Sequence, residues 1–203
     1  MSVLALLWSK PLLPLSHTSF SAHMLLHLGL VLVVAPLLAA PIAQRVPAPH
    51  VAGEAAQWYL LAAAFETVTV SGWHVPALHD ATGYFTAMFV VEQASFLASG
   101  VALWTALFTA RTRISAIFAA LVAALTFSHM SMFGLLLALV PHLIYDPDLC
   151  RGWAGFGGLD DQHLGGALMA AGGLAFLGVA VVFLARAIHT AEDRERSVPA
   201  TAR

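Results

Sequence analysis

Charged residues are scarce in this sequence. Lysine and arginine together number 9, aspartate and glutamate number 11, and hydrophobic residues make up 60% of the 203-residue chain. In a soluble domain of average composition, about a quarter of the residues are charged. Too few polar side chains are therefore present to cover a globule in water. This composition excludes an ordinary soluble domain and indicates an integral membrane protein.

Cysteine and basic tracts are also nearly absent. Cys150 is the one cysteine, so the chain cannot form an internal disulfide or a metal site with two cysteines. It has no basic run of the kind that neutralises a phosphate backbone, which excludes nucleic-acid binding. No nucleophile, base and orienting acid occur together at suggestive spacing, so we do not expect an enzyme. Any site for a soft metal must use histidine and methionine.

Long apolar segments recur along the chain. A hydrocarbon core about 30 Å thick needs about 20 apolar residues in a helix. The sequence therefore predicts an all-α integral membrane protein, a bundle of about five transmembrane helices in a single domain over residues 1–190, followed by a charged tail over 191–203. The predicted spans cover approximately residues 22–42, 55–75, 83–109, 114–140 and 164–188.

Arginines and acids separate to opposite ends of these spans. Arginines lie in two of the links and around the end of the last span: Arg45, Arg111, Arg113, Arg186, Arg194 and Arg196. Acids gather in the link over residues 141–163. The positive-inside rule then places the N-terminus outside and the tail in the cytoplasm. Lys10 follows the first apolar stretch instead of preceding it, so we expect that stretch to be retained at the membrane interface and not cleaved as a signal peptide.

Histidine and methionine concentrate toward the predicted outer side. His23 and His27 are one helical turn apart, so both imidazoles face one way and could clamp a metal. The competing interpretation is that interfacial histidines reach headgroups or water. His74 and His79 lie in a short polar link, which could equally be a solvated loop.

Two carboxylates fall inside predicted spans. Placing Glu66 and Glu92 at that depth costs free energy, so we expect them to be protonated, hydrogen-bonded inside the bundle or functional. Met88 lies one turn before Glu92 and shares its face. His129 and Met132, three residues apart, likewise share a face. Methionine often packs cores without a further role, but a neighbouring intramembrane histidine favours a ligand pair.

The last span opens with an acidic and polar group. Asp161 and His163 could contribute to a site, although Asp160 or Asp161 is also expected to cap the helix. The glycine pairs at 165–166 and 172–173 predict close packing of this helix against a neighbour.

These groups converge on the outer half of the membrane, and copper suits them best. Imidazole and thioether favour Cu(I), and imidazole with carboxylate tolerates Cu(II), whereas zinc more often recruits cysteine or a compact three-ligand set. The predicted metal ligands are His23, His27, His74, His79, Met88, Glu92, His129, Met132, Asp161 and His163.

Several motifs resemble those of CtaG-type cytochrome c oxidase assembly factors. They are His23-Met24-Leu25-Leu26-His27 followed by Ala35-Pro36, Trp73-His74-Val75-Pro76, the helix with Glu92, and Asp161-Gln162-His163-Leu164-Gly165-Gly166. The resemblance covers most of residues 20–175. It implies a role in loading copper into the oxidase, with His23, His27, His74 and the Asp161-Gln162 region as functional positions. His129 and Met132 match no family motif, so they are predicted as ligands only from the chemistry of their side chains.

The leading hypothesis is a non-catalytic copper-binding assembly factor of the bacterial plasma membrane. Its partners would be the lipid bilayer and the catalytic subunit of cytochrome c oxidase or another cuproprotein. A homo-oligomer is also compatible with the sequence. A second hypothesis is a membrane cytochrome in which His27 and His129 ligate a b-type haem. A third is a structural subunit of a respiratory oxidase whose histidines form only interhelical hydrogen bonds.

Overall fold

The computed structural model describes residues 12–49, 51–153 and 155–197, and every regular element in that part of the chain is helical. The elements are α2 (Leu12–Leu15), α3 (Phe20–Gly29), the π-helical turn η1 (Leu30–Val34), α4 (Ala35–Ala43), α5 (Ala52–Trp73), α6 (Pro76–Tyr84), α7 (Thr86–Phe108), α8 (Arg113–Leu139) and α9 (Gly158–Ser197).

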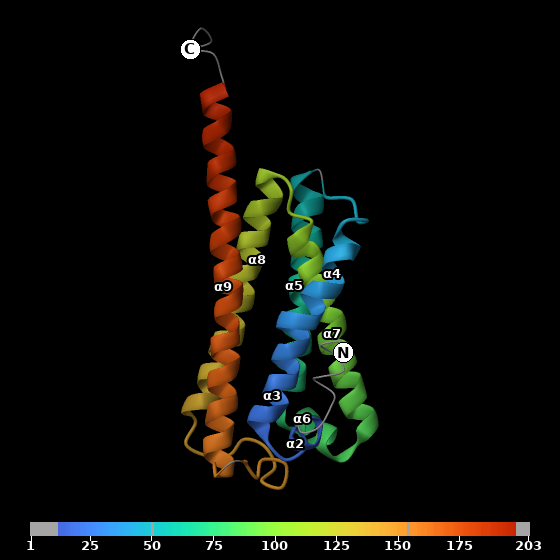
Figure 1. Ribbon diagram of the computed structural model, residues 1–203, viewed down its shortest axis with the longest axis vertical. Helices are drawn as coiled ribbons and strands as arrows, with labels where there is room; N and C mark the ends of the chain where they lie inside the picture. The colour runs from blue at the N-terminus through green and yellow to red at the C-terminus, as the bar shows by residue number, and fades with distance from the viewer. Residues whose placement is uncertain (1–11, 50, 154, 198–203) are drawn as a thin grey trace.

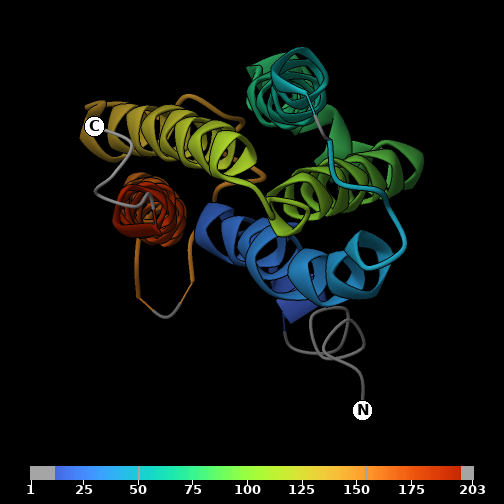
Figure 2. The same ribbon diagram turned by 90° about the horizontal axis from the view of Figure 1, so that it is seen from above.

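The long helices form a closed ring. α3, η1 and α4 follow one another as one long rod, and this rod, α5, α7, α8 and α9 run roughly along a common axis (Figure 1). α9 packs against α3 and α8, α8 against α5, α5 against α7, and α7 against α4. Seen from above, these helices stand around a common interior, which their buried side chains fill (Figure 2). Side chains that point inward from any of these helices can therefore meet.

The number of spans is only partly settled by the structure. Four helical stretches are long and apolar enough to cross a membrane: Phe20–Ala43, Thr86–Phe108, Arg113–Leu139 and Gly158–His189. They agree with four predicted spans to within a few residues, and the chain is a multi-pass membrane protein. The 22 residues of α5 would extend about 33 Å. Glu54, Gln57 and Glu66 lower its hydropathy, and its role as a fifth span stays a prediction.

The two ends of the bundle differ in charge. Arg45, Arg111 and Arg113 hydrogen-bond to main-chain carbonyls at the end of the bundle where α4 and α7 end and α8 begins. The loop between α8 and α9, with Asp146 and Asp148, lies beside α2 and α6 at the other end (Figure 1). We call these the arginine end and the acidic end. An arginine end in the cytoplasm stays a prediction of the positive-inside rule.

Three boundaries differ from the sequence-based expectation. α4 continues through Pro41 to Ala43, one residue beyond the predicted end of the first span. The polar link after α5 forms a short helix, α6, which was not predicted, and the alternative of a solvated loop is excluded. α9 continues to Ser197, so residues 191–197 of the predicted tail are helical. Residues 198–203, and most of the predicted interfacial segment (residues 1–11), lie outside the described part of the chain.

The π-helical turn has an identifiable cause. Pro36 has no N–H, so the helix cannot close its regular bond at this position. The Ala35 N–H donates instead to the Leu30 carbonyl, five residues back. The Val31 carbonyl is thereby left without a backbone donor, and the indole of Trp104 on α7 donates to it at 2.7 Å. This bond ties α7 to the rod one turn beyond His27.

Glycines let α9 approach its neighbours, as predicted. A Cβ on Gly166 would lie 2.6 Å from the Gly134 carbonyl oxygen of α8, closer than real Cβ atoms come. A Cβ on Gly165 would meet the Phe20 ring and the Met24 side chain of α3. α9 therefore packs directly on both helices and brings its inward face close to the histidines of α3.

Candidate metal centre

Two histidines of α3 meet a carboxylate of α7 at the acidic end. The Nε2 atom of His23 lies 3.1 Å from both carboxylate oxygens of Glu92, and the Nε2 atom of His27 lies 3.5 Å from Oε1. One nitrogen or oxygen from each residue falls within 4.8 Å of the others. His23, His27 and Glu92 are 4%, 5% and 0% exposed, so water contributes little to balancing their charges. We call these three residues the His–Glu cluster.

Neighbouring groups orient the cluster. The Nδ1 atom of His23 lies 3.2 Å from the Ser16 carbonyl oxygen, which accepts a hydrogen bond when Nδ1 is protonated and leaves Nε2 as the free ligand atom. The His27 ring stacks on Phe96 with centroids 3.9 Å apart. The Gln93 side-chain amide donates to Glu92 Oε2 at 3.1 Å. Such second contacts are typical of metal sites, because they fix the ring orientation and the tautomer of the ligands.

Asp161 at the start of α9 holds the start of α3. Its carboxylate accepts hydrogen bonds from the Ser19 hydroxyl at 3.1 Å, from the Phe20 N–H at 2.7 Å and from the Ser21 hydroxyl. The sequence predicted Asp161 either as a metal ligand or as a cap of its own helix. In the structure it binds the free N–H groups of α3 instead, one turn before His23. Its side chain is occupied there and lies apart from the His–Glu cluster.

Gln162 and His163 hold the loop that closes the acidic end. The Gln162 side chain accepts from the Ile144 N–H at 2.8 Å and donates to the His142 carbonyl at 3.2 Å. The Nε2 atom of His163 lies 2.8 Å from the Val140 carbonyl. The structure thus places His163, a predicted ligand, against the end of α8 and not in the cluster.

Two further histidines surround the cluster. His79 of α6 lies with its ring centroid 4.9 Å from that of His23, and burial, followed by repulsion from His23, lowers its pKa well below the usual value. A neutral imidazole is the form that binds metals. His74 follows α5, with its ring centroid 6.4 Å from that of His27. Both predicted ligands are therefore buried next to the cluster, at 5% and 8% exposure.

A second ionisable pair lies deeper in the bundle. The Nε2 atom of His129 on α8 is 3.5 Å from Glu66 Oε2 on α5. Glu66 is fully buried, and neither carboxylate oxygen has a hydrogen bond. His129 thus lies apart from the His–Glu cluster and faces another carboxylate.

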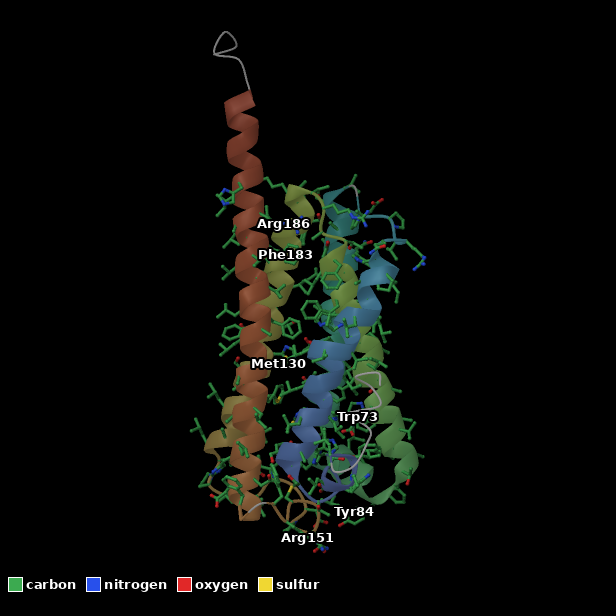
Figure 3. The ribbon with its side chains drawn as sticks, in the orientation of Figure 1. Trp73, Tyr84, Met130, Arg151, Phe183 and Arg186 are labelled. Atoms are coloured by element: carbon green, nitrogen blue, oxygen red, sulfur yellow. The ribbon has the colours of Figure 1, made fainter. Side chains whose placement is uncertain are left out.

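The predicted methionine ligands do not reach the cluster. Met132 is 54% exposed on the outer surface of α8, and Met88 is half-buried on α7. Buried Met24, Met130 and Met169 instead point between the helices. Figure 3 labels Met130, roughly midway along the bundle. The sequence offered one signal for Met24, its position between the two cluster histidines. Metal binding by any of these residues stays a prediction.

The chemistry of the His–Glu cluster fits a single metal ion. Ligand atoms around a four-coordinate ion lie roughly 3 to 3.5 Å apart when metal–nitrogen distances are about 2 Å. The two His-to-Glu92 distances already match that spacing. Across the described residues, no other set of at least three histidine, cysteine or acidic side chains gathers so closely. Cys150 is buried in the loop between α8 and α9, where burial raises its pKa to about 12, and it is not part of the cluster.

Comparison with known proteins agrees with the motifs. The model of the cytochrome c oxidase caa3 assembly factor family (Caa3_CtaG) matches residues 1–190, which include every residue of the site. No curated protein and no solved structure matches the chain. Because the family match covers nearly the whole chain, the protein belongs to the cytochrome c oxidase caa3 assembly factor family.

Proposed function

We propose that this protein is a membrane copper-binding assembly factor that holds copper at the His–Glu cluster and delivers it to a heme–copper oxidase subunit. The family supports the assembly role and interaction with an oxidase. One structural observation supports the copper site most strongly: two imidazoles and a carboxylate meet, buried, at one end of the bundle. The role is that of a carrier and not of an enzyme.

Copper is the metal that fits both the donors and the recipient. Two imidazoles with one carboxylate would also suit zinc or iron(II). The oxidase that the family serves takes copper at its active site, and imidazole holds both Cu(I) and Cu(II). Glu92 supplies one negative charge, so a Cu(I) ion at the cluster leaves no net charge in the apolar surroundings. Copper is here the cargo that the protein passes on.

Delivery proceeds by ligand exchange. In the protein without copper, the His23–Glu92 contact keeps the carboxylate partnered. Copper replaces that contact, and docking of the oxidase subunit brings competing imidazoles to the acidic end. When copper leaves, His23 and Glu92 pair again, so the empty site does not leave an unpaired charge in the bundle. The site can thus release its metal without a large penalty.

The space inside the bundle favours a metal ion over haem. The cavity beside His27 and His74 has a free volume of ≈ 20 Å³, whereas pockets for cofactors of that size measure about 300 Å³ or more. His129, the other histidine of the haem hypothesis, faces Glu66. A purified protein without a haem band in its reduced-minus-oxidised spectrum is the expected result.

The test is metal analysis of the full-length purified protein after copper loading. The double variant His23→Ala/His27→Ala and the single variant Glu92→Gln are expected to lose the copper ion of the cluster and to lower the copper content of the oxidase in cells. His142→Ala is the matched control, since this histidine is exposed at the same end of the bundle and outside the cluster. It should bind copper as the wild type does.

Two results would contradict the proposal. Unchanged copper content in both cluster variants would remove the cluster as the site. Stoichiometric co-purification with an oxidase, with no copper bound and full oxidase activity in cells with either variant, would instead favour a structural subunit.

A further inference from the structure

A small cavity lies inside the ring of helices, next to the His–Glu cluster. Six elements contribute to its wall: α3, η1, α5, α7, α8 and α9. The side chains that line it and can bind a metal are His27, Glu66, His74, Met24, Met130 and Met169. Its free volume of ≈ 20 Å³ has room for about one water molecule, and therefore for one metal ion.

Three residues that line this cavity carry buried polar atoms without a hydrogen bond, although His27 Nε2 lies 3.5 Å from Glu92 and Glu66 Oε2 lies 3.5 Å from His129. Both ring nitrogens of His27, Nε2 of His74 and both carboxylate oxygens of Glu66 are buried and form no hydrogen bond. The other nitrogen of His74, Nδ1, lies 2.6 Å from the Val70 carbonyl, and this contact fixes the ring. A buried polar group without a hydrogen bond costs about 1 to 3 kcal/mol. Several such groups around one small cavity indicate a ligand that satisfies them.

Three methionines complete the lining. Met24, Met130 and Met169 are 2%, 4% and 3% exposed and come from three different helices. Methionine alone often serves as core filler. Around a cavity that also presents unpartnered imidazole nitrogens, thioethers supply the soft donors that select Cu(I).

The spacing of the two imidazoles fits one ion between them. Metal–nitrogen distances of about 2 Å on either side of an ion put the two ring centroids roughly 6 Å apart. The centroids of His27 and His74 are 6.4 Å apart. Phe96, which also lines the cavity, stacks on His27 and holds that ring in place.

We propose that this cavity is a second metal site, specific for Cu(I), in which His27, His74 and the thioethers of Met24, Met130 and Met169 are the candidate ligands and Glu66 balances the charge. This proposal rests on the proposed function, because it takes copper as the metal. His27 belongs to both sites, since its ring also faces Glu92. A neutral imidazole binds one ion at a time, so when both sites are filled His27 stays with the cluster, and His74 and the thioethers hold the ion in the cavity. Copper moves between the two sites by exchange at His27.

The test is X-ray absorption at the copper edge, with the full chain in detergent and loaded with Cu(I). The wild type is expected to show sulfur neighbours and to hold one ion in the cavity besides the one in the cluster. The triple variant Met24→Leu/Met130→Leu/Met169→Leu should lose the sulfur signal and one of the two ions. Glu92→Gln should lose the other ion and keep the sulfur signal.

The controls separate folding from binding. Leucine has nearly the volume of methionine, so each replacement should change the stability by less than about 1.5 kcal/mol, which thermal unfolding checks. Met130→Leu alone should already weaken the sulfur signal if the triple variant unfolds. Met132→Leu, on the exposed face of α8, should change nothing. A wild type without sulfur neighbours, or a folded triple variant with unchanged copper, overturns the cavity site. If copper binding depends on Glu92 but the X-ray absorption shows no sulfur neighbours, the cavity site is wrong and the proposed function still holds.

Discussion

The two halves of the bundle bury different kinds of residue. The half at the acidic end buries the ionisable groups His23, His27, Glu92, Glu66, His74, His79 and Asp161. The half at the arginine end is filled by alanine and large apolar side chains, among them Ala39, Ala55, Tyr59, Leu103, Leu107, Ala119 and Ala123. Within the described residues, no histidine or acid is buried in that half. The same helices build both halves, so the difference lies in the residues and not in the architecture.

This difference separates stability from function. Close contacts between small and apolar side chains stabilise the arginine-end half without any ligand. Buried imidazoles and carboxylates without hydrogen bonds destabilise the other half, where Glu66 and His27 are examples. A protein keeps such groups where they bind something. Variants in the two halves should therefore differ in whether copper binding changes together with stability.

The largest expected effect is at Asp161. Replacement by alanine removes the acceptor of the Ser19, Phe20 and Ser21 donors, which then lie buried without partners. We expect a loss of about 3 kcal/mol or more of stability, together with lower copper content, because α3 is no longer held at its start. Thermal unfolding and metal analysis measure the two effects. Exposed Asp160→Ala is the control and should change the stability by less than about 0.5 kcal/mol. Equal effects from both variants would contradict this role.

The next effect is at the contact between α8 and α9. In Gly134→Ala the new methyl group would meet the Gly166 carbonyl oxygen at 2.6 Å, so the helices must separate. We expect a loss of about 1 to 3 kcal/mol from this overpacking. Copper bound per folded molecule should stay unchanged. Gly178→Ala, with open space around it, is the control and should be neutral or slightly stabilising. If Gly134→Ala lost as much copper as a variant of the His–Glu cluster, copper binding would depend on the contact between α8 and α9, which would contradict this prediction.

The smallest effect lies at the surface of the acidic end. The hydroxyl of Tyr84 donates to Asp146 at 2.6 Å, and this bond raises the pKa of Tyr84 to about 12. A pKa raised in the folded state stabilises the protein fully below the unfolded value, about 10, and the contribution is lost as the pH rises to about 12. The difference between the tyrosinate titrations of the wild type and Tyr84→Phe should be one step near pH 12. Copper binding should not change in this variant, and a step near pH 10 would mean that the bond does not form in solution.

The sequence predicted the helices and the histidine pair of α3 better than it predicted which side chains meet. The apolar runs predicted the spans, and the spacing of His23 and His27 predicted one shared face. That Glu92 joins them depends on α7 packing beside the rod of α3, η1 and α4, and periodicity within one helix says nothing about which helices are neighbours. The resemblance to the family included both the histidines and the helix with Glu92, but it did not predict that these side chains meet.

Asp161 illustrates the opposite case. An aspartate before a helix predicts a cap for that helix, because its own free N–H groups are nearest in sequence. In the fold, the carboxylate accepts hydrogen bonds from the start of α3, which offers two serine hydroxyls besides its N–H groups. The π-helical turn was not predicted either, although Pro36 after Ala35 is the signal that explains it.

Copper affinity of the wild type and of Glu92→Gln, measured by competition with a chelator, tests the central claim most directly. Glutamine keeps the shape of the side chain but removes its charge, and both histidines remain. We expect copper to bind at least about 100-fold more weakly in the variant, which corresponds to about 2.7 kcal/mol. Equal affinity in the two proteins, with both folded, would contradict the account that the buried carboxylate and imidazoles form a copper site.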